Sequence, residues 1–135
     1  MRSRILFISG RLDDARRISQ MLEPLRVELD HAQDLRQARA KLQQDEYEVV
    51  LTEAALPDGT WLDVLHLARA HPVDLEVVVT DPLADARLWS DVLNLGAFDL
   101  LSQPFYAPEV RRVLSNACEQ TRQAHWDLGH VMAAH

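Results

Sequence analysis

Polar residues that could do chemistry stand directly after four short apolar runs of the sequence. Ser9-Gly10-Arg11 follows the first run, Glu53 the second, Thr80 the third and Gln103 the fourth. Such a set offers a carboxylate, hydroxyls, an amide and a guanidinium, and Ser9-Gly10-Arg11 before a helix could hold an anion. The glycine-rich pattern G-x-G-x-x-G and the Walker A pattern are missing, so a cofactor-dependent enzyme has little support.

Alternating strands and helices must position these residues. Continuous apolar runs are typical of strands buried on both faces of a parallel sheet. They occur at residues 5–8, 49–51 and 77–79, which predicts central strands at 5–8, 47–52 and 76–80. Weaker strands are expected at 26–30, which alternates as an edge strand might, and at 98–101. Five helical patterns lie between and after them. Asp13 or Asp14 caps the first, Asp34 opens the second, and residues 61–70 form the third. The fourth begins at Asp81-Pro82 and ends at Gly96, and the last begins at Ala107-Pro108.

This order predicts an α/β fold of five βα units, a doubly wound parallel five-stranded sheet with helices on both faces. In open sheets of this kind the site lies at the carboxyl ends of the strands. The four polar positions are therefore expected to meet at one edge of the sheet.

Composition excludes several classes of protein. The 135 residues make one ordinary domain, and 21 acids against 14 bases give a net charge of −7, which argues against binding to nucleic acid or to an anionic membrane. Cys118 is the single cysteine, which excludes an intramolecular disulfide and suits a reducing compartment. Neither a membrane span nor a signal peptide is recognisable, so a cytoplasmic location is expected.

The segments 49–59, 77–80 and 96–105 carry a resemblance to a known family. In this order and spacing they resemble the receiver domain of two-component response regulators over about residues 4–117. The resemblance implies a flavodoxin-like receiver fold for residues 1–117, and residues 118–135 are then a C-terminal helical extension. It also implies a phosphoacceptor aspartate that takes a phosphoryl group from a histidine kinase, an acidic pair that helps to hold Mg²⁺, a Thr or Ser after the fourth strand, and a lysine before Pro-Phe.

The departures from that family pattern matter more than the matches. Thr80 is retained, but Glu53 stands at the phosphoacceptor position, Ser9 and Gly10 replace the acidic pair, Gln103 replaces the lysine, and Leu100 replaces the aromatic switch residue. A hard dication needs several anionic or carbonyl oxygens, and one glutamate with a serine and a glycine supplies too few. We therefore expect no metal, no cofactor and no phosphorylation by the family mechanism.

Arg11 and Glu53 each leave two interpretations. The Arg11 guanidinium could pair with the Glu53 carboxylate bidentately and replace both the metal and the lysine, or it could point into solvent. Glu53 is either a constitutive imitation of the phosphorylated state or a solvated carboxylate without a signalling role. Thr80 is expected to be a locally hydrogen-bonded hydroxyl.

Other features carry smaller expectations. Gln103-Pro104 matches the cis peptide of the family, with Pro104 as the cis-proline. Trp61 is expected to cap the third helix, whereas Trp89 could belong to the core or face a partner. The histidines lack ligand spacing, which argues against a metal site.

The C-terminal segment has a weak heptad-like seam. Its members are Val110, Leu114, Ala117, Thr121, Ala124, Leu128 and Val131. Either an extended fifth helix pairs in a dimer or once led to an output module, or the terminal helix frays or folds back over its own domain.

We therefore predict a phosphorylation-independent, non-enzymatic interaction module in two-component signalling. Its partner would be a signalling kinase or an output protein, or a second copy that binds through the fourth and fifth helices and the C-terminal helix. The alternatives are a phosphoacceptor with an unconventional site and a small-ligand or anion-binding module at the same crevice.

Overall fold

Seven strands and five helices make up the described chain. The computed structural model describes residues 3–72 and 75–133, with the backbone alone for His125 and residues 127–133. The strands are β1 (Ser3–Ile8), β2 (Val27–Ala32), β3 (Val49–Glu53), β4 (Ala55–Leu56), β5 (Gly59–Thr60), β6 (Glu76–Asp81) and β7 (Asp99–Ser102). The helices are α1 (Leu12–Met21), α2 (Leu35–Gln44), α3 (Trp61–Ala70), α4 (Ala86–Asn94) and α5 (Ala107–Ala133).

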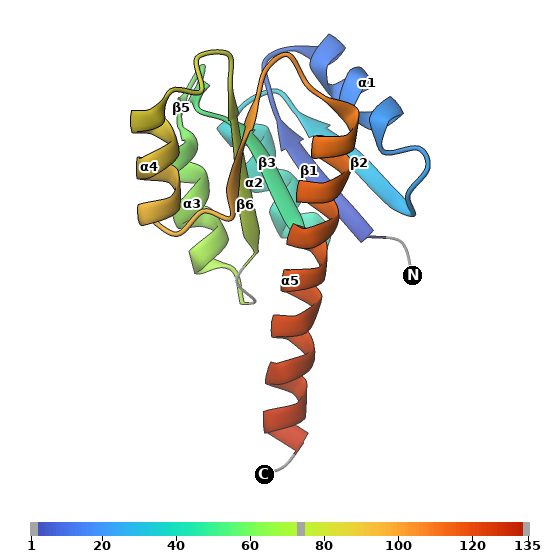
Figure 1. The fold of residues 1–135 in the computed structure, drawn as a ribbon. Coiled ribbons are helices and arrows are strands. Elements are labelled where there is room, and N and C mark those ends of the chain that lie inside the picture. Colours follow the sequence, from blue (N-terminus) through green and yellow to red (C-terminus); the bar gives the residue numbers. More distant parts are fainter. Residues whose placement is uncertain (1–2, 73–74, 134–135) are drawn as a thin grey trace.

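Five parallel strands form the main sheet in the order β2-β1-β3-β6-β7 (Figure 1). The antiparallel pair β4-β5 forms a small hairpin directly after β3. This confirms the predicted (βα)5 sheet and its parallel strands. The edge strand expected at residues 26–30 is indeed an edge strand, because β2 has β1 as its one neighbour in the sheet.

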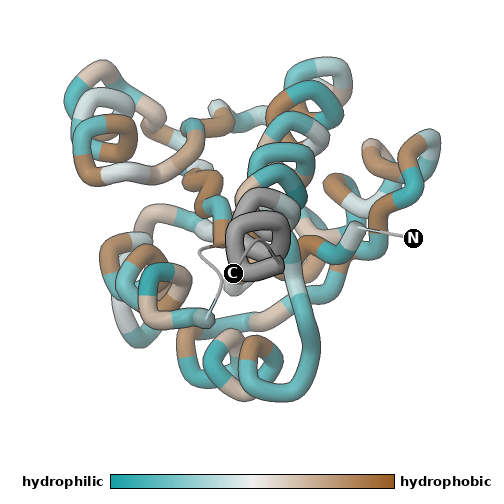
Figure 2. The backbone as a smooth tube through the Cα atoms, turned by 90° about the horizontal axis from the view of Figure 1, so that it is seen from below, coloured by the Kyte–Doolittle hydropathy of each residue, from teal (hydrophilic) through white to brown (hydrophobic). Residues whose placement is uncertain are grey.

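Each central strand serves two cores because successive side chains point to opposite faces of the sheet. On β1, Leu6 and Ile8 join the core beneath α2, α3 and α4, whereas Ile5 and Phe7 join the core beneath α1 and α5. This explains the continuous apolar runs in the sequence. In the view from below (Figure 2), the helices carry both hydrophobic and hydrophilic stretches, as expected of helices with one buried side.

Three helix starts were predicted correctly, and one of them is that of α5, which begins at Ala107 as expected. The Asp34 side chain accepts a hydrogen bond from the backbone N–H of Gln37 at 2.8 Å, so Asp34 caps α2. α3 covers residues 61–70 as expected, and Thr60 and Asp63 form a reciprocal capping box at its start. Trp61, the first residue of α3, is 7% exposed and packs in the core.

Two other helix starts were predicted wrongly. α1 begins at Leu12 with Arg11 at the cap position, so Asp13 and Asp14 lie inside the first turn, where the helix dipole favours acids. β6 continues through Asp81, which pairs with Ser102 of β7, and Asp85 caps α4 instead. Pro82 therefore lies in the connection between β6 and α4 and not in the first turn of the helix.

α5 is one continuous helix of 27 residues that extends past the lower end of the sheet (Figure 1). It does not fold back over the domain, and it runs across the predicted boundary between residues 117 and 118. Val110, Leu114, Ala117 and Thr121 are buried against their own sheet, so the predicted dimer seam is wrong for this half of the pattern. Ala124 is exposed, and the side chains of Leu128 and Val131 lie outside the described residues.

The lower end of the sheet anchors α5 by polar contacts. The Thr121 hydroxyl donates to the carbonyl of Glu48 at 2.6 Å. Arg122 forms an ion pair with Glu48 at 3.1 Å and donates to the hydroxyl of Ser3. No helix in the described part of the chain is long and apolar enough to cross a membrane.

Candidate functional site at the carboxyl edge of the sheet

The register of the sheet brings the predicted polar residues to one edge. Ile8 pairs with Thr52, so Ser9 and Glu53 follow neighbouring strands. Glu53 in turn pairs with Thr80 of β6. Strand ends that meet in this way form the crevice in which open α/β sheets carry their sites.

Ser9 holds Glu53 by a short hydrogen bond. The Ser9 hydroxyl is completely buried and donates to Oε1 of Glu53 at 2.6 Å. The same hydroxyl accepts the backbone N–H of Arg11 at 3.0 Å, and the Ser9 carbonyl lies 2.7 Å from Nε2 of His31. The half-buried Glu53 carboxylate is thus tied to the connection between β1 and α1 by a neutral donor.

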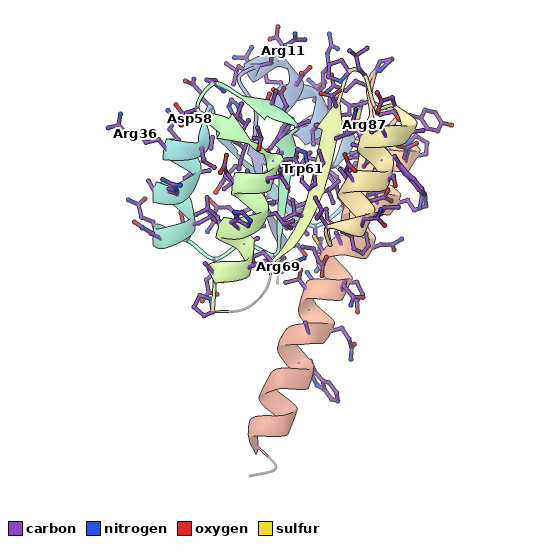
Figure 3. All side chains as sticks on the ribbon, turned by 90° about the vertical axis from the view of Figure 1, so that its left-hand side faces the viewer. Arg11, Arg36, Asp58, Trp61, Arg69 and Arg87 are labelled. Atoms are coloured by element: carbon purple, nitrogen blue, oxygen red, sulfur yellow. The ribbon has the colours of Figure 1, made fainter. Side chains whose placement is uncertain are left out.

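Arg11 does not take part in this contact. Its side chain is exposed at the upper end of the molecule (Figure 3), and the described residues include no ion pair between Arg11 and Glu53. The hypothesis of a bidentate Arg11–Glu53 pair is therefore wrong. The buried Ser9 hydroxyl satisfies one oxygen of Glu53 from inside the crevice, so only the backbone of Arg11 contributes there.

Thr80 and Gln103 form the second polar contact of the crevice. The fully buried Thr80 hydroxyl donates to the carbonyl of Leu101 at 2.9 Å and accepts Nε2–H of Gln103 at 3.2 Å. This confirms the expectation that Thr80 is bonded locally. The Gln103-Pro104 peptide is cis, as predicted.

Leu100 lies away from this polar contact. It is 7% exposed and belongs to the core that α4 covers, together with Val92 and Ala97. The aliphatic side chain therefore serves packing. Trp89 on α4, in contrast, is 52% exposed, so of the two interpretations its position favours the partner-facing one.

The connection after Glu53 is hydrogen-bonded to β6, to the start of α3 and to the start of α2. The backbone N–H of Ala54 donates to the carbonyl of Thr80 at 3.0 Å, and its carbonyl accepts the N–H of Trp61 at 3.1 Å. Asp58 reaches a different helix, where its carboxylate accepts the N–H groups of Leu35 at 2.9 Å and Arg36 at 3.1 Å. These bonds hold the pKa of the Asp58 carboxyl below its usual value.

Sequence reasoning missed this role of Asp58. The acid was visible in the turn after the third strand, but which helix it caps depends on how the hairpin packs. Gly59 leaves room for two side chains at that point, because a Cβ there would lie 2.6 Å from Oδ2 of Asp63 and 3.1 Å from Cδ2 of Leu35, and both would have to shift. The close approach of the β4-β5 hairpin, α2 and α3 thus accounts for both Asp58 and Gly59.

The residues of the crevice do not fit the magnesium ion that the family resemblance implies. Glu53 supplies one carboxylate, and one of its oxygens already accepts the Ser9 hydroxyl. Among the described residues, no group of three or more His, Cys, Asp or Glu side chains is placed to hold a metal ion. Mg²⁺ demands near-octahedral oxygen coordination, and these side chains do not supply it.

Comparisons with known proteins agree on one family. A sequence profile of the response regulator receiver domain matches residues 11–115. The chain is 29% identical over 116 residues to the transcriptional regulatory protein KdpE of Staphylococcus aureus, covering 82% of this chain and 48% of that protein. It is 29% identical over 111 residues to the response regulator protein PilR of Pseudomonas aeruginosa, covering 78% of this chain and 25% of that protein.

The chain thus spans half or less of the length of these relatives. A solved structure, the signal receiver domain of an HD domain-containing protein from Pseudomonas fluorescens Pf-5, superimposes with a TM-score of 0.78 at 26% identity, covering 91% of this chain and 99% of that one. The chain therefore belongs to the response regulator receiver domain family, the signalling modules of two-component systems.

Proposed function

We propose that this receiver domain signals through protein contact and does not accept a phosphoryl group by the mechanism of its family. The carrying observation is the 2.6 Å hydrogen bond from Ser9 to Glu53. In this proposal Glu53 stands at the phosphoacceptor position, and Ser9 with Gly10 stands at the positions of the acidic pair. A neutral hydroxyl then does structurally what a metal and two acids would otherwise do.

The chemistry of phosphoryl transfer supports this proposal. Transfer to a carboxylate needs cations that neutralise the charge on the transferring oxygens. Gln103 stands at the position of the lysine, and its amide is hydrogen-bonded to Thr80 at 3.2 Å. The exposed Arg11 guanidinium makes no ion pair with Glu53 within the described chain. The negative charge of a phosphorylated side chain would therefore have no neighbouring cation among the described residues to neutralise it.

Glu53 then acts as a fixed negative charge. A glutamate reaches one methylene further than an aspartate, and it imitates an acyl phosphate with a single charge and a planar head. The hydrogen bond from Ser9 orients this carboxylate, so the conformation of the crevice is set without a phosphate.

Incubation with acetyl phosphate and Mg²⁺, followed by intact-mass measurement, tests the proposal. The natural chain should show no mass gain, whereas a phosphoryl group on Glu53 would overturn the proposal. The matched control restores the family residues with Ser9→Asp, Gly10→Asp, Glu53→Asp and Gln103→Lys in one chain. If those four positions account for the loss, the restored chain gains one phosphoryl group.

The partner would bind at the face that α4, β7 and the beginning of α5 form. β7 is an edge strand, and exposed apolar side chains flank it: Trp89 is 52% exposed, Leu93 37%, Leu95 54% and Tyr106 66%. An apolar face of this kind on a protein of net charge −7 indicates a protein contact. The partner is a signalling kinase, an output protein or a second copy, and the part of α5 below the sheet can extend the contact.

Sedimentation velocity of the full chain separates a second copy from another partner. If two copies pair through this face, Trp89→Ser with Leu93→Ser shifts the chain to the monomer, whereas Leu62→Ser on α3, a side chain with 40% exposure, does not. A dimer that the double variant leaves unchanged would rule out this face. A monomeric natural chain would rule out the second copy and leave another protein as the partner.

The same proposal places the chain in the cytoplasm. Cys118 is a free, buried thiol, which suits a reducing compartment.

A further inference from the structure

The net charge of the helices is concentrated in α2. Its ten residues include Arg36, Arg39 and Lys41 and no acid. The other four helices each contain as many acids as bases. In a chain of net charge −7, α2 is therefore a positive segment surrounded by a negative remainder.

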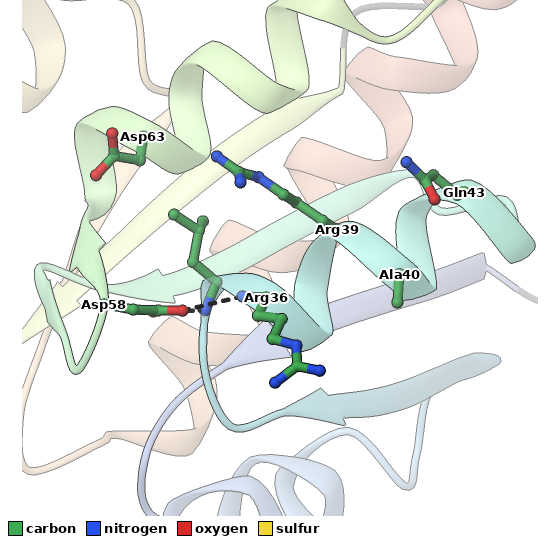
Figure 4. A pocket seen from close by; sticks show the side chains of 7 residues that line it. Arg36, Arg39, Ala40, Gln43, Asp58 and Asp63 are labelled. Carbon is green, nitrogen blue, oxygen red and sulfur yellow. Dashed lines mark hydrogen bonds between the residues drawn. The ribbon is translucent and has the colours of Figure 1, made fainter.

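A hollow of about 410 Å³ lies between α2 and the beginning of α3 (Figure 4). Arg36, Arg39, Ala40 and Gln43 line it from α2, and Asp58 and Asp63 line it from the other side. The hollow is thus lined by two arginines, an amide and two carboxylates with some apolar surface. The Arg39 side chain extends towards α3 and Asp63, whereas the Arg36 side chain extends in a different direction (Figure 4).

Both carboxylates are already engaged in capping. Asp58 accepts the backbone N–H groups of Leu35 and Arg36, and Asp63 accepts the N–H of Thr60 at 2.9 Å. The first amides of α2 are occupied by the same bonds. These acids are therefore fixed in place, and the N-terminus of α2 is not an open anion site.

The two arginine side chains remain available. Arg36 and Arg39 are exposed, and neither guanidinium makes a hydrogen bond or a close ion pair within the described chain. The hydrogen bond from Leu35 lowers the pKa of the Asp58 carboxyl, and the charge of Arg39 adds to this effect at longer range. Residues three positions apart lie on the same side of a helix, about one turn apart. A guanidinium binds a carboxylate bidentately through its planar fork.

We propose that this hollow binds an acidic segment of a partner protein, with two carboxylates about one helical turn apart on Arg36 and Arg39. The surface is separate from the proposed partner face, because α2 packs near β1 and β2, whereas α4 packs against β7 at the other edge of the sheet. The inference does not depend on the fate of Glu53.

A short acidic protein segment fits this surface better than a long polyanion. Nucleic acid and anionic membranes extend over many charges and would meet the negative remainder of the chain. A segment that fills one hollow contacts the positive helix without that repulsion.

The test uses the full chain and a short helical peptide whose glutamates are spaced three and four residues apart, followed by fluorescence anisotropy. Arg36→Ala with Arg39→Ala should weaken binding about tenfold or more, the equivalent of one strong charged contact. The matched control is Arg16→Ala with Arg17→Ala, which removes two exposed arginines from α1 and should change the affinity less than about twofold.

A lysine variant and a folding check complete the experiment. Arg36→Lys with Arg39→Lys keeps the charge but loses the bidentate fork, so it should bind with intermediate affinity, and circular dichroism confirms that each variant is folded. The proposal is overturned if the peptide does not bind, if its glutamine counterpart binds equally, or if the α1 control weakens binding as much. Tighter binding of a DNA oligonucleotide or of anionic vesicles at α2 would overturn it as well.

Discussion

The two ends of the parallel sheet use polar residues in opposite ways. At the lower end Arg4 contacts Asp30 at 2.7 Å, Asp45 at 3.3 Å and the ring of Tyr47 at 5.1 Å, and Arg122 contacts Glu48 at 3.1 Å. At the carboxyl edge the side-chain bonds between the strand ends come from the neutral donors of Ser9, Thr80 and Gln103. The ion pairs between fully described residues all belong to the lower end.

This difference separates the lower end of the sheet, which stabilises the fold, from the carboxyl edge, which carries the candidate site. Parallel strands place their sites at the carboxyl edge, so the lower end is free to stabilise the fold. There, the charged network joins β1, β2 and the segment that leads into β3, and it anchors α5. At the carboxyl edge a single carboxylate with a neutral donor keeps the crevice ordered but unsuited to a metal. Substitutions at the lower end should therefore change stability, whereas those at the crevice should change it less.

Tyr47 at the lower end should give the largest effect. Its side chain is 4% exposed, and its hydroxyl donates to Asp30 at 2.6 Å. Tyr47→Ala should lower the free energy of unfolding by about 3 kcal/mol or more through the cavity, and Tyr47→Phe by about 1 kcal/mol through the hydrogen bond. Urea unfolding measures both losses. A loss below about 1 kcal/mol for Tyr47→Ala would show that the lower end does not stabilise the fold as expected.

Cys118 reports whether the lower end stays closed. Burial raises the pKa of this thiol to about 11, and the reactive species is the thiolate. With an ordinary pKa near 8.5 as reference, its thiolate fraction at pH 8 should be roughly 200-fold lower. The rate with a disulfide reagent at pH 8 should therefore rise strongly when urea unfolds the chain. Equal rates in the folded and unfolded chains would show an open lower end.

Thr80 tests the crevice. Thr80→Val keeps the volume but removes the hydrogen bonds to Leu101 and Gln103, so the free energy of unfolding should fall by about 1 kcal/mol. Gln103→Ala, which removes one of these two bonds near the surface, should cost less. Thermal unfolding of the two variants side by side checks the order. A cost for Gln103→Ala above that for Thr80→Val would show that the amide, and not the hydroxyl, organises this edge.

Asp58 should give the smallest effect, and that effect should depend on pH. Its folded-state pKa is lowered by the hydrogen bonds from Leu35 and Arg36. A lowered pKa contributes stability above the unfolded-state value near 4, and this contribution is lost as the pH falls through the folded-state pKa. Asp58→Ala should therefore be less stable than the natural chain at pH 7, and the gap should narrow below about pH 4. A gap that is constant with pH would mean that packing of the hairpin, and not the carboxylate, holds α2.

The three central strands were predictable because burial on both faces leaves a strong signal in each run. The apolar residues of β1, β3 and β6 fill two cores at once, and no polar residue interrupts those runs before the carboxyl edge. Helix starts were less predictable. Asp81 and Asp85 are both good caps in sequence, and the pairing of Asp81 with Ser102 decides between them.

The chain by itself determined the residue types at the four strand ends: a hydroxyl, a carboxylate, a hydroxyl and an amide. It also determined that they lie at one edge, because the alternation of strands and helices predicts parallel strands, and the carboxyl ends of parallel strands share one edge of the sheet. Tertiary structure alone decided their partners. Ser9 rather than Arg11 reaches Glu53, Asp58 caps a helix more than twenty positions away in sequence, and four positions of the predicted seam on α5 are buried in their own domain. Such contacts depend on side-chain directions and on the close approach of distant elements, and local sequence patterns do not encode these.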